Sequence, residues 1–297
     1  MSRSKHKLKN HPKYQAKNQQ GFTLIELVTV IVILGVLATG ISSFLRFGTQ
    51  SYTDAADRDA LISTARFVVE RLNREVRNAL PNSIRTIGGD NNPCLEFVPI
   101  DKSVIYLDIP VAPEPASDSV EVLMLAGALS SQYVAVYALN SDDIYNKKSG
   151  VIEKFLPFLP GDYSGDRQVV STIRFDSKIR FEEESPTERL YFIGSPVSYC
   201  LEDQAIYRYQ AYGFGNYDYD SDDRPLRPLI TKTTEKVFEK RLMAEYVDNY
   251  SLSGTVLPFQ TSKATLQRNG LALIRLKFAR NLEEIVFNNE IQVPNVP

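Results

Sequence analysis

Histidine is almost absent from this sequence, and its absence excludes several kinds of catalytic and metal site. The only two histidines, His6 and His11, lie in the segment that ends at Gly21, so a chain that loses this leader retains none. Catalysis by Ser-His-Asp or Cys-His groups and zinc or haem held by histidine are therefore excluded. An enzyme that works with carboxylates alone stays open, but no motif points to one. We expect a protein that is not an enzyme and has no cofactor.

The counts of glycine, cysteine and proline exclude three further classes. With 15 Gly, 2 Cys and 16 Pro, the chain is not a collagen, a disulfide-rich mini-protein or a coiled-coil rod. Hydrophobic residues make up 43% of the chain, which is enough for a folded core and excludes general disorder. The 297 residues allow one large domain or two modest ones.

Basic residues are concentrated at the start of the chain. The segment from Met1 to Gly21 contains no acid and six basic residues: Arg3, Lys5, Lys7, Lys9, Lys13 and Lys17. Since the whole chain has a net charge of −2, the remainder carries −8, which is −2 minus +6. Nucleic acid is bound by clustered Lys and Arg. We therefore expect no nucleic-acid partner for this acidic body.

An apolar run follows the basic leader. Residues 22–45 contain one charge, Glu26, and at 1.5 Å per residue they are long enough to cross a bilayer core of about 30 Å. The positive-inside rule places the leader in the cytoplasm and the body on the periplasmic or external side. A cleaved secretory signal is the alternative, but its apolar region is usually shorter, and a carboxylate near its start is not typical. Placing a carboxylate in a membrane segment costs free energy, so we expect the Glu26 side chain to have a partner.

The sequence Gly21-Phe22-Thr23-Leu24-Ile25-Glu26-Leu27 closely resembles the processing site of type IV pilins and type II secretion pseudopilins. The resemblance implies that a prepilin peptidase cuts after Gly21 and methylates the new N-terminal amine of Phe22. It also implies that Glu26 pairs with the N-terminus of a neighbouring subunit. Such an ion pair would neutralise two charges that the bilayer solvates poorly. The alternative is an uncleaved signal anchor whose Glu26 extends toward the interface.

Two further segments are similar to minor pilins of mannose-sensitive haemagglutinin (MSHA) pili: residues 53–85 with Cys94-Leu95-Glu96-Phe97, and residues 266–297. The resemblance implies a minor pilin in an initiation or tip complex that supports surface attachment. Its partners would be the membrane, prepilin peptidase, the inner-membrane assembly platform and other major and minor pilins. It would lie first in the inner membrane, with a single span and a periplasmic head, and then in a pilus on the cell surface. A type II secretion minor pseudopilin and a membrane-anchored adhesin or binding protein remain alternatives.

Periodicity predicts a long helix followed by strands. Apolar residues recur every three or four positions over residues 46–80, and no proline interrupts residues 22–80 before Pro81. Gly35, Gly40 and Gly48 within this helix are either small residues for helix packing or bending sites. After Pro81 the pattern predicts strands at 95–100, 104–109, 120–125, 133–139, 169–175, 178–182, 190–193, 197–201, 206–212 and 271–278, and a helix at 231–247.

The predicted organisation is a cleaved leader (1–21), an N-terminal helix (22–80, transmembrane over 22–45) and a β-rich head (81–297). The fold class is α+β, with the long transmembrane and amphipathic helix packed on the antiparallel β-rich head. The resemblance to pilins implies the same lollipop shape.

Three groups of residues in the head are candidate sites. Cys94 and Cys200 are the only cysteines, and an oxidising compartment favours a disulfide between them, the alternative being two buried thiols.

The second candidate is a run of carboxylates that alternate as in a calcium loop. The glycine and the glutamate of that loop are missing, so a solvated turn is the favoured interpretation. The carboxylates are Asp218, Asp220, Asp222 and Asp223. An aromatic cluster, for which strand packing is favoured over ligand recognition, comprises Tyr207, Tyr209, Tyr212, Phe214, Tyr217 and Tyr219.

Overall fold

The computed structural model describes residues 21–89, 93–123, 129–157, 170–215, 217–219, 225–228, 239–251, 254–264, 268–281 and 283–293. The chain divides into two compact units, Met1–Thr53 and Asp54–Pro297.

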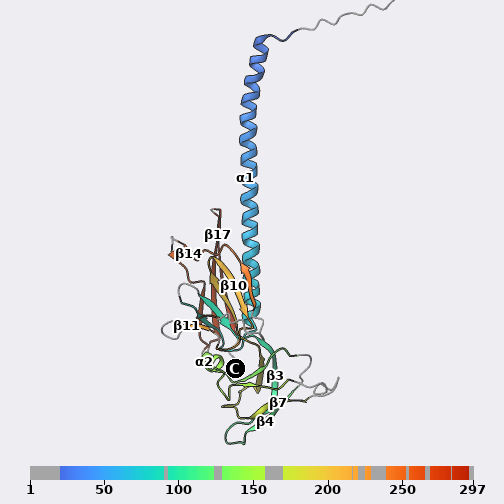
Figure 1. Cartoon of the computed structure of the whole chain (residues 1–297), viewed down its shortest axis with the longest axis vertical. Coiled ribbons are helices and arrows are strands. Elements are labelled where there is room, and N and C mark those ends of the chain that lie inside the picture. The colour runs from blue at the N-terminus through green and yellow to red at the C-terminus, as the bar shows by residue number, and fades with distance from the viewer. Residues whose placement is uncertain are drawn as a thin grey trace, which may run out of the picture. The chain divides into compact units, whose positions relative to one another are not determined.

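One long helix, α1 (Leu24–Arg77), contributes to both units (Figure 1). The helix begins two residues later and ends three residues earlier than the sequence pattern indicates. Its end precedes Pro81 because the main-chain N–H of Leu80 already donates to the carbonyl of Val98, at 2.8 Å. The hydrogen bond between Leu80 and Val98 therefore ends the helix before Pro81 is reached.

The strands of the second unit form antiparallel sheets. A five-stranded sheet has the order β1 (Arg85–Ile87), β2 (Cys94–Phe97), β9 (Val197–Glu202), β10 (Ala205–Gln210) and β13 (Glu239–Ala244). A three-stranded sheet has the order β16 (Phe259–Ser262), β17 (Gly270–Arg280) and β18 (Glu283–Val293). A six-stranded sheet has the order β6 (Ile152–Lys154), β5 (Tyr133–Val136), β8 (Arg189–Ile193), β3 (Ile100–Asp108), β4 (Ser117–Leu123) and β7 (Val170–Ile179).

Smaller elements complete the described part of this unit. β11 (Tyr217–Tyr219) pairs with β12 (Pro225–Pro228), and β14 (Tyr250–Ser251) pairs with β15 (Gly254–Thr255). A short helix, α2 (Ser141–Tyr145), lies between β5 and β6 in the sequence.

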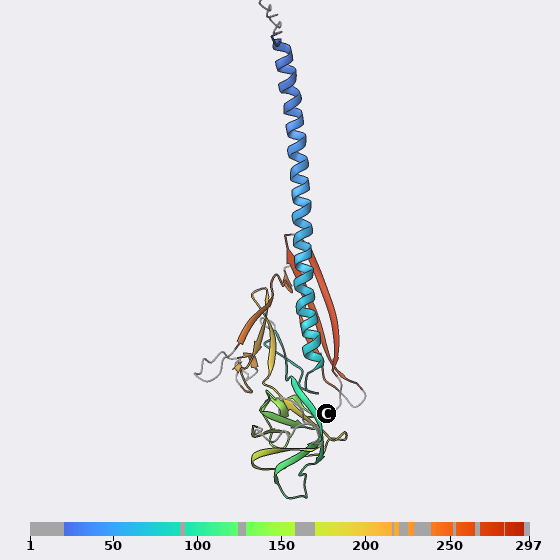
Figure 2. The same cartoon turned by 90° about the vertical axis from the view of Figure 1, so that its right-hand side faces the viewer.

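The main core lies between the second half of α1 and two of the sheets. Seven residues of α1 are buried, five of them at spacings of three or four: Leu61, Ala65, Val68, Leu72 and Val76. They pack against apolar residues of the five-stranded and three-stranded sheets. Figure 2 shows β17 and β18, in red, beside the cyan part of α1. The α+β fold predicted from the sequence, with a long helix packed on antiparallel sheet, is confirmed.

Two further cores belong to the six-stranded sheet and its surroundings. One lies within that sheet and contains Ile173, Leu190 and Phe192. The other includes Leu80, three residues after the end of α1, together with Val98 and residues of α2. Leu80 therefore connects the segment that follows α1 to the six-stranded part of the head.

The helix predicted at 231–247 is wrong over the described residues. Residues 239–244 are strand β13, which pairs with β10, and Val247 bridges to Phe278 of β17. Residues 231–238 lie outside the described ranges. The sequence of 239–244 contains good helix formers, but long-range pairing that buries Met243 and Ala244 outweighs this weak local preference.

The strand predicted at 178–182 is not a separate element, because β7 continues from Val170 to Ile179.

Candidate processing and assembly site

The first turn of α1 is stabilised by a capping box. Gly21, Phe22 and Thr23 precede the helix, which places the Gly21–Phe22 bond in non-helical backbone. Glu26 N–H donates to Thr23 Oγ1 at 3.3 Å, while Thr23 N–H and its hydroxyl donate to Glu26 Oε2 at 2.9 and 3.0 Å. These reciprocal bonds satisfy main-chain donors that the helix leaves free. The sequence motif predicted Glu26 as an assembly residue, but not its role as a helix cap.

The Glu26 carboxylate remains available to a further donor. Both bonds from Thr23 use Oε2, and Glu26 is exposed. The nearest basic residue along α1 is Arg46, more than five helical turns further on and about 30 Å away. Among the described residues of the first unit, no Lys or Arg side chain therefore lies within five helical turns of Glu26.

The first half of α1 has an uncovered apolar surface. Every residue from Gly21 to Thr53 is exposed, with Phe22 at 88% and Leu24 at 81%. This stretch is long and apolar enough to cross a membrane. The hydroxyls of Thr29 and Thr39 donate to main-chain carbonyls one turn earlier, at 3.0 and 2.8 Å. Such bonds satisfy hydroxyl groups without water, which suits a hydrocarbon environment.

The glycines of this half-helix are not required by the packing of the chain itself. α1 passes through Gly35, Gly40 and Gly48 without interruption. A Cβ added at any of them would meet nothing within 4 Å. Small residues at such positions allow close approach of another helix.

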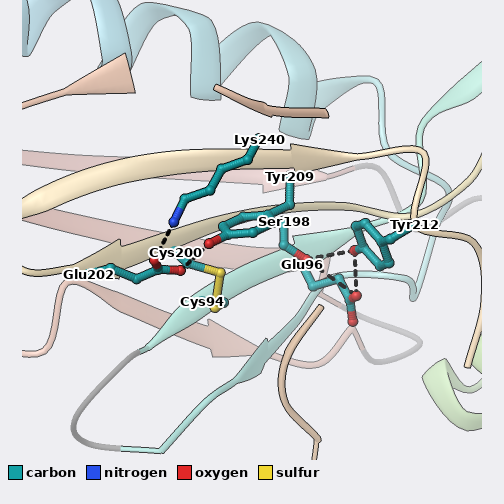
Figure 3. Close-up of a disulfide and its surroundings, with 8 residues drawn as sticks. All are labelled: Cys94, Glu96, Ser198, Cys200, Glu202, Tyr209, Tyr212 and Lys240. Atoms are coloured by element: carbon teal, nitrogen blue, oxygen red, sulfur yellow. Dashed lines mark hydrogen bonds and ion pairs between the residues drawn. A yellow bond between two sulfur atoms is a disulfide. The ribbon is translucent and has the colours of Figure 1, made fainter. Parts of the chain in front are cut away.

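Cys94 and Cys200 lie directly opposite each other on neighbouring strands of the head. The register of β2 and β9 pairs the two residues, and their sulfur atoms form a bond of 2.03 Å (Figure 3). Both residues are fully buried, and the bond joins positions 106 residues apart. In the chain-entropy model a bond that closes a loop of this length stabilises the fold by up to about 4.7 kcal/mol.

A buried carboxylate lies beside the disulfide on the same strand. The Glu96 side chain is fully buried, and its oxygens accept hydrogen bonds from Arg85 Nε and the Tyr212 hydroxyl, both at 2.6 Å. Ser198 Oγ donates to Glu96 at 3.3 Å, and Figure 3 shows Glu96, Ser198 and Tyr212 next to the disulfide. No motif in the sequence predicts this cluster. The only local signal is that Arg85 and Glu96 lie directly opposite each other on the neighbouring strands β1 and β2.

The same arginine connects two parts of the head. The guanidinium of Arg85 lies 3.5 Å from the ring centre of Tyr145 on α2, and the Tyr145 hydroxyl donates to the Ser83 carbonyl at 2.8 Å. Burial, and then the negative charge of Glu96, raise the pKa of Tyr145 and of Tyr212 well above the ordinary value. Both tyrosines therefore stay neutral hydrogen-bond donors at physiological pH.

The other candidate groups have different outcomes. Asp220, Asp222 and Asp223 lie outside the described residues, and of Asp218 only the backbone, in β11, is described. In the part of the chain that the structure describes, no cluster of three or more His, Cys, Asp or Glu could hold a metal ion.

The aromatic cluster is largely core. Tyr209, Tyr212 and Tyr217 are buried around the disulfide. Phe214 packs against Tyr133, with ring centres 5.5 Å apart. Strand and core packing therefore explains these side chains, as the favoured interpretation predicted.

The N-terminal part of the chain is similar to a known protein family. The family model described as the prokaryotic N-terminal methylation motif matches residues 16–42, which include the capping box and most of the apolar half of α1. No curated protein and no solved structure matches the chain. The motif indicates a precursor of the type IV pilin or pseudopilin class, a structural rather than enzymatic kind of protein. In that class the precursor is processed by a prepilin peptidase and assembles with other pilins.

Proposed function

We propose that this chain is a minor pilin of an MSHA-type type IV pilus, and that it acts in pilus initiation or in the tip complex to support surface attachment. Within such pili its resemblance is to the minor pilin MshO. The observation that carries the proposal is the methylation motif at residues 16–42 on a half-helix whose apolar side chains are all exposed.

The local structure around Gly21 supports the proposed processing step. Proteolysis needs a non-helical peptide bond, and the Gly21–Phe22 bond lies before the first turn of α1. Prepilin peptidase cuts this bond and methylates the amine of Phe22. The capping box belongs to residues 23–26 and is unchanged by the cut, so the shortened chain keeps its helix start.

Assembly then pairs Glu26 with the N-terminal ammonium of a neighbouring pilin. Oε2 is held by Thr23, which leaves Oε1 to take the new donor. In a membrane or a packed helix bundle an unpaired ammonium or carboxylate raises the free energy. Pairing of the two charges therefore favours the assembled state. Lipid covers the apolar half of α1 before assembly, and helices of other subunits cover it afterwards.

The apolar helix and the size of the head support a proposed location and position in the filament. The protein first spans the inner membrane once with its head in the periplasm, and the assembly platform then moves it into the pilus. The second unit extends from Asp54 to Pro297 and so contains most of the chain. A head of this size is larger than a subunit repeated along a shaft needs, which supports a place in the starting or tip complex.

A deletion strain tests this function. Electron microscopy should show fewer surface pili of unchanged length, because a starter complex sets how many filaments begin, and attachment should fall in proportion. Expression of the wild-type chain should restore both. Unchanged pilus numbers with attachment alone lost would contradict a priming role and favour an adhesin. Loss of protein secretion with normal pili would identify a type II secretion pseudopilin.

A further inference from the structure

In the described part of the head, β18 lies at the edge of the three-stranded sheet. It has 11 residues, and among the described strands it pairs with β17 alone. The β17–β18 register is regular over its whole length, from Gly270 opposite Val293 to Arg280 opposite Glu283, without a bulge. Long regular edge strands are uncommon, because proteins usually protect them with bulges, proline, lysine or a covering segment. The sequence of β18 contains no proline and no lysine.

The main-chain groups that face outward from this edge can be assigned. Two residues separate Arg280 from Glu283, and in such a hairpin the closing pair exchanges hydrogen bonds. Odd-numbered residues of β18 therefore bond to β17, and the N–H and C=O groups of the even-numbered residues point away from it. Consistently, Arg275 and Ala279 of β17 donate on the opposite side of that strand, to Pro258 and Tyr246. The outward-facing set is Glu284, Val286, Asn288, Glu290 and Gln292.

The apolar face beside this edge is incompletely covered. Ile285 and Phe287 pack against the main core but are only partly buried. Phe287 lies edge-on to Phe278, with ring centres 6.2 Å apart. A strand added next to β18 would place its inward side chains beside these two residues and extend the core. Strand addition in proteins gains affinity from main-chain hydrogen bonds and specificity from such side-chain contacts.

The charge of the edge indicates what kind of strand it accepts. β18 carries three carboxylates, on Glu283, Glu284 and Glu290, and no basic residue. Glu284 is paired with Lys277 of β17 at 2.8 Å. Opposite charges on directly facing strands are stabilising and like charges are destabilising. The edge therefore favours a strand with net positive charge and disfavours another copy of itself.

We propose that β18 is a docking edge for a net-basic strand from the head of another pilin-type subunit. The identity of the partner rests on the proposed function, since subunits whose N-terminal helices lie together hold their heads at high effective concentration. At such concentrations even a short strand addition forms, without a large buried area.

A pair of substitutions at Val286 separates main-chain pairing from side-chain effects. Proline is tolerated at an edge position whose N–H faces outward, so Val286→Pro should leave the β17 hydrogen bonds intact while removing one outward donor and blocking close approach. Val286→Ala keeps that donor and is the matched control. A photoreactive amino acid at the exposed residue Gln292 of the full-length protein, expressed in its host, reports the neighbour.

The expected result is a crosslink to a different protein that carries the N-terminal methylation signal, identified by mass spectrometry. The yield should fall about tenfold with Val286→Pro and stay near wild type with Val286→Ala. No crosslink, a crosslink only to a second copy of this chain, or equal yields for both variants would overturn the proposal. The mass of the N-terminal peptide is read from the same samples. A processed N-terminus without the crosslink rejects the docking edge alone, whereas an unprocessed N-terminus rejects the proposed function.

Discussion

Removal of Arg85, the cation paired with the buried Glu96, should destabilise the head strongly. Glu96 is fully buried, and Arg85 Nε at 2.6 Å is the cation that compensates its charge. In Arg85→Met the carboxylate loses this cation and keeps the hydroxyl donors of Tyr212 and Ser198. Breaking one side of a buried ion pair costs about 3–5 kcal/mol, and loss of the contact over the Tyr145 ring adds about 0.5–1 kcal/mol. We expect the free energy of unfolding to fall by about 4 kcal/mol.

Two control variants isolate the cause. Arg241 also forms an ion pair, with Glu239 at 2.7 Å, but its side chain is 59% exposed, so Arg241→Met should cost less than about 1 kcal/mol. Combining Arg85→Met with Glu96→Gln removes the buried charge and should recover about half of the loss. Urea unfolding of the full-length protein in detergent, followed by near-ultraviolet circular dichroism, measures all three variants. Equal losses for Arg85→Met and Arg241→Met would refute the reasoning.

Three more predictions follow from the same contacts. Glu26→Gln keeps the acceptor for Thr23 but loses the charge, so membrane insertion and cleavage should persist while the amount in sheared pili falls about tenfold; wild-type amounts would contradict the ion pair. Alkylation of unfolded, unreduced protein should label neither Cys94 nor Cys200, and labelling of both would exclude their disulfide. Burial raises the pKa of Tyr145, so its neutral form favours the folded state. Burial raises the pKa of Tyr212 in the same way. Stability in urea should therefore hold up to about pH 9 and fall above about pH 10, by about 1.4 kcal/mol per pH unit for each of these two tyrosines, while a flat profile would contradict the burial.

The helix and several strands could be predicted because their signals are local. α1 combines an uninterrupted apolar run with a stripe of buried residues every three or four positions, and both features depend only on neighbours in the chain. Its end could not be placed as well, because Leu80 bonds to Val98, which lies beyond strands β1 and β2 in the sequence. The processing motif was equally local, being one short run from Gly21 to Leu27.

The parts that sequence reasoning missed depend on long-range pairing. β13 has the composition of a helix and becomes a strand through its partner β10. The Glu96 cluster brings together Arg85, Tyr212 and Ser198, which are separated from Glu96 by 11, 116 and 102 residues. The spacing of residues in one sequence does not indicate that these side chains are close in the fold, because their proximity arises from the order and register of the strands.

The mass of the mature N-terminus tests the central claim most directly. Intact-mass and N-terminal peptide measurements on protein extracted from membranes or pili should find a chain that begins at Phe22 and carries one additional methyl group on its amine. Cleavage near Ile41 would instead indicate an ordinary secretory signal, and an uncut chain would indicate a signal anchor. Either of those results would contradict the assignment to the pilin class.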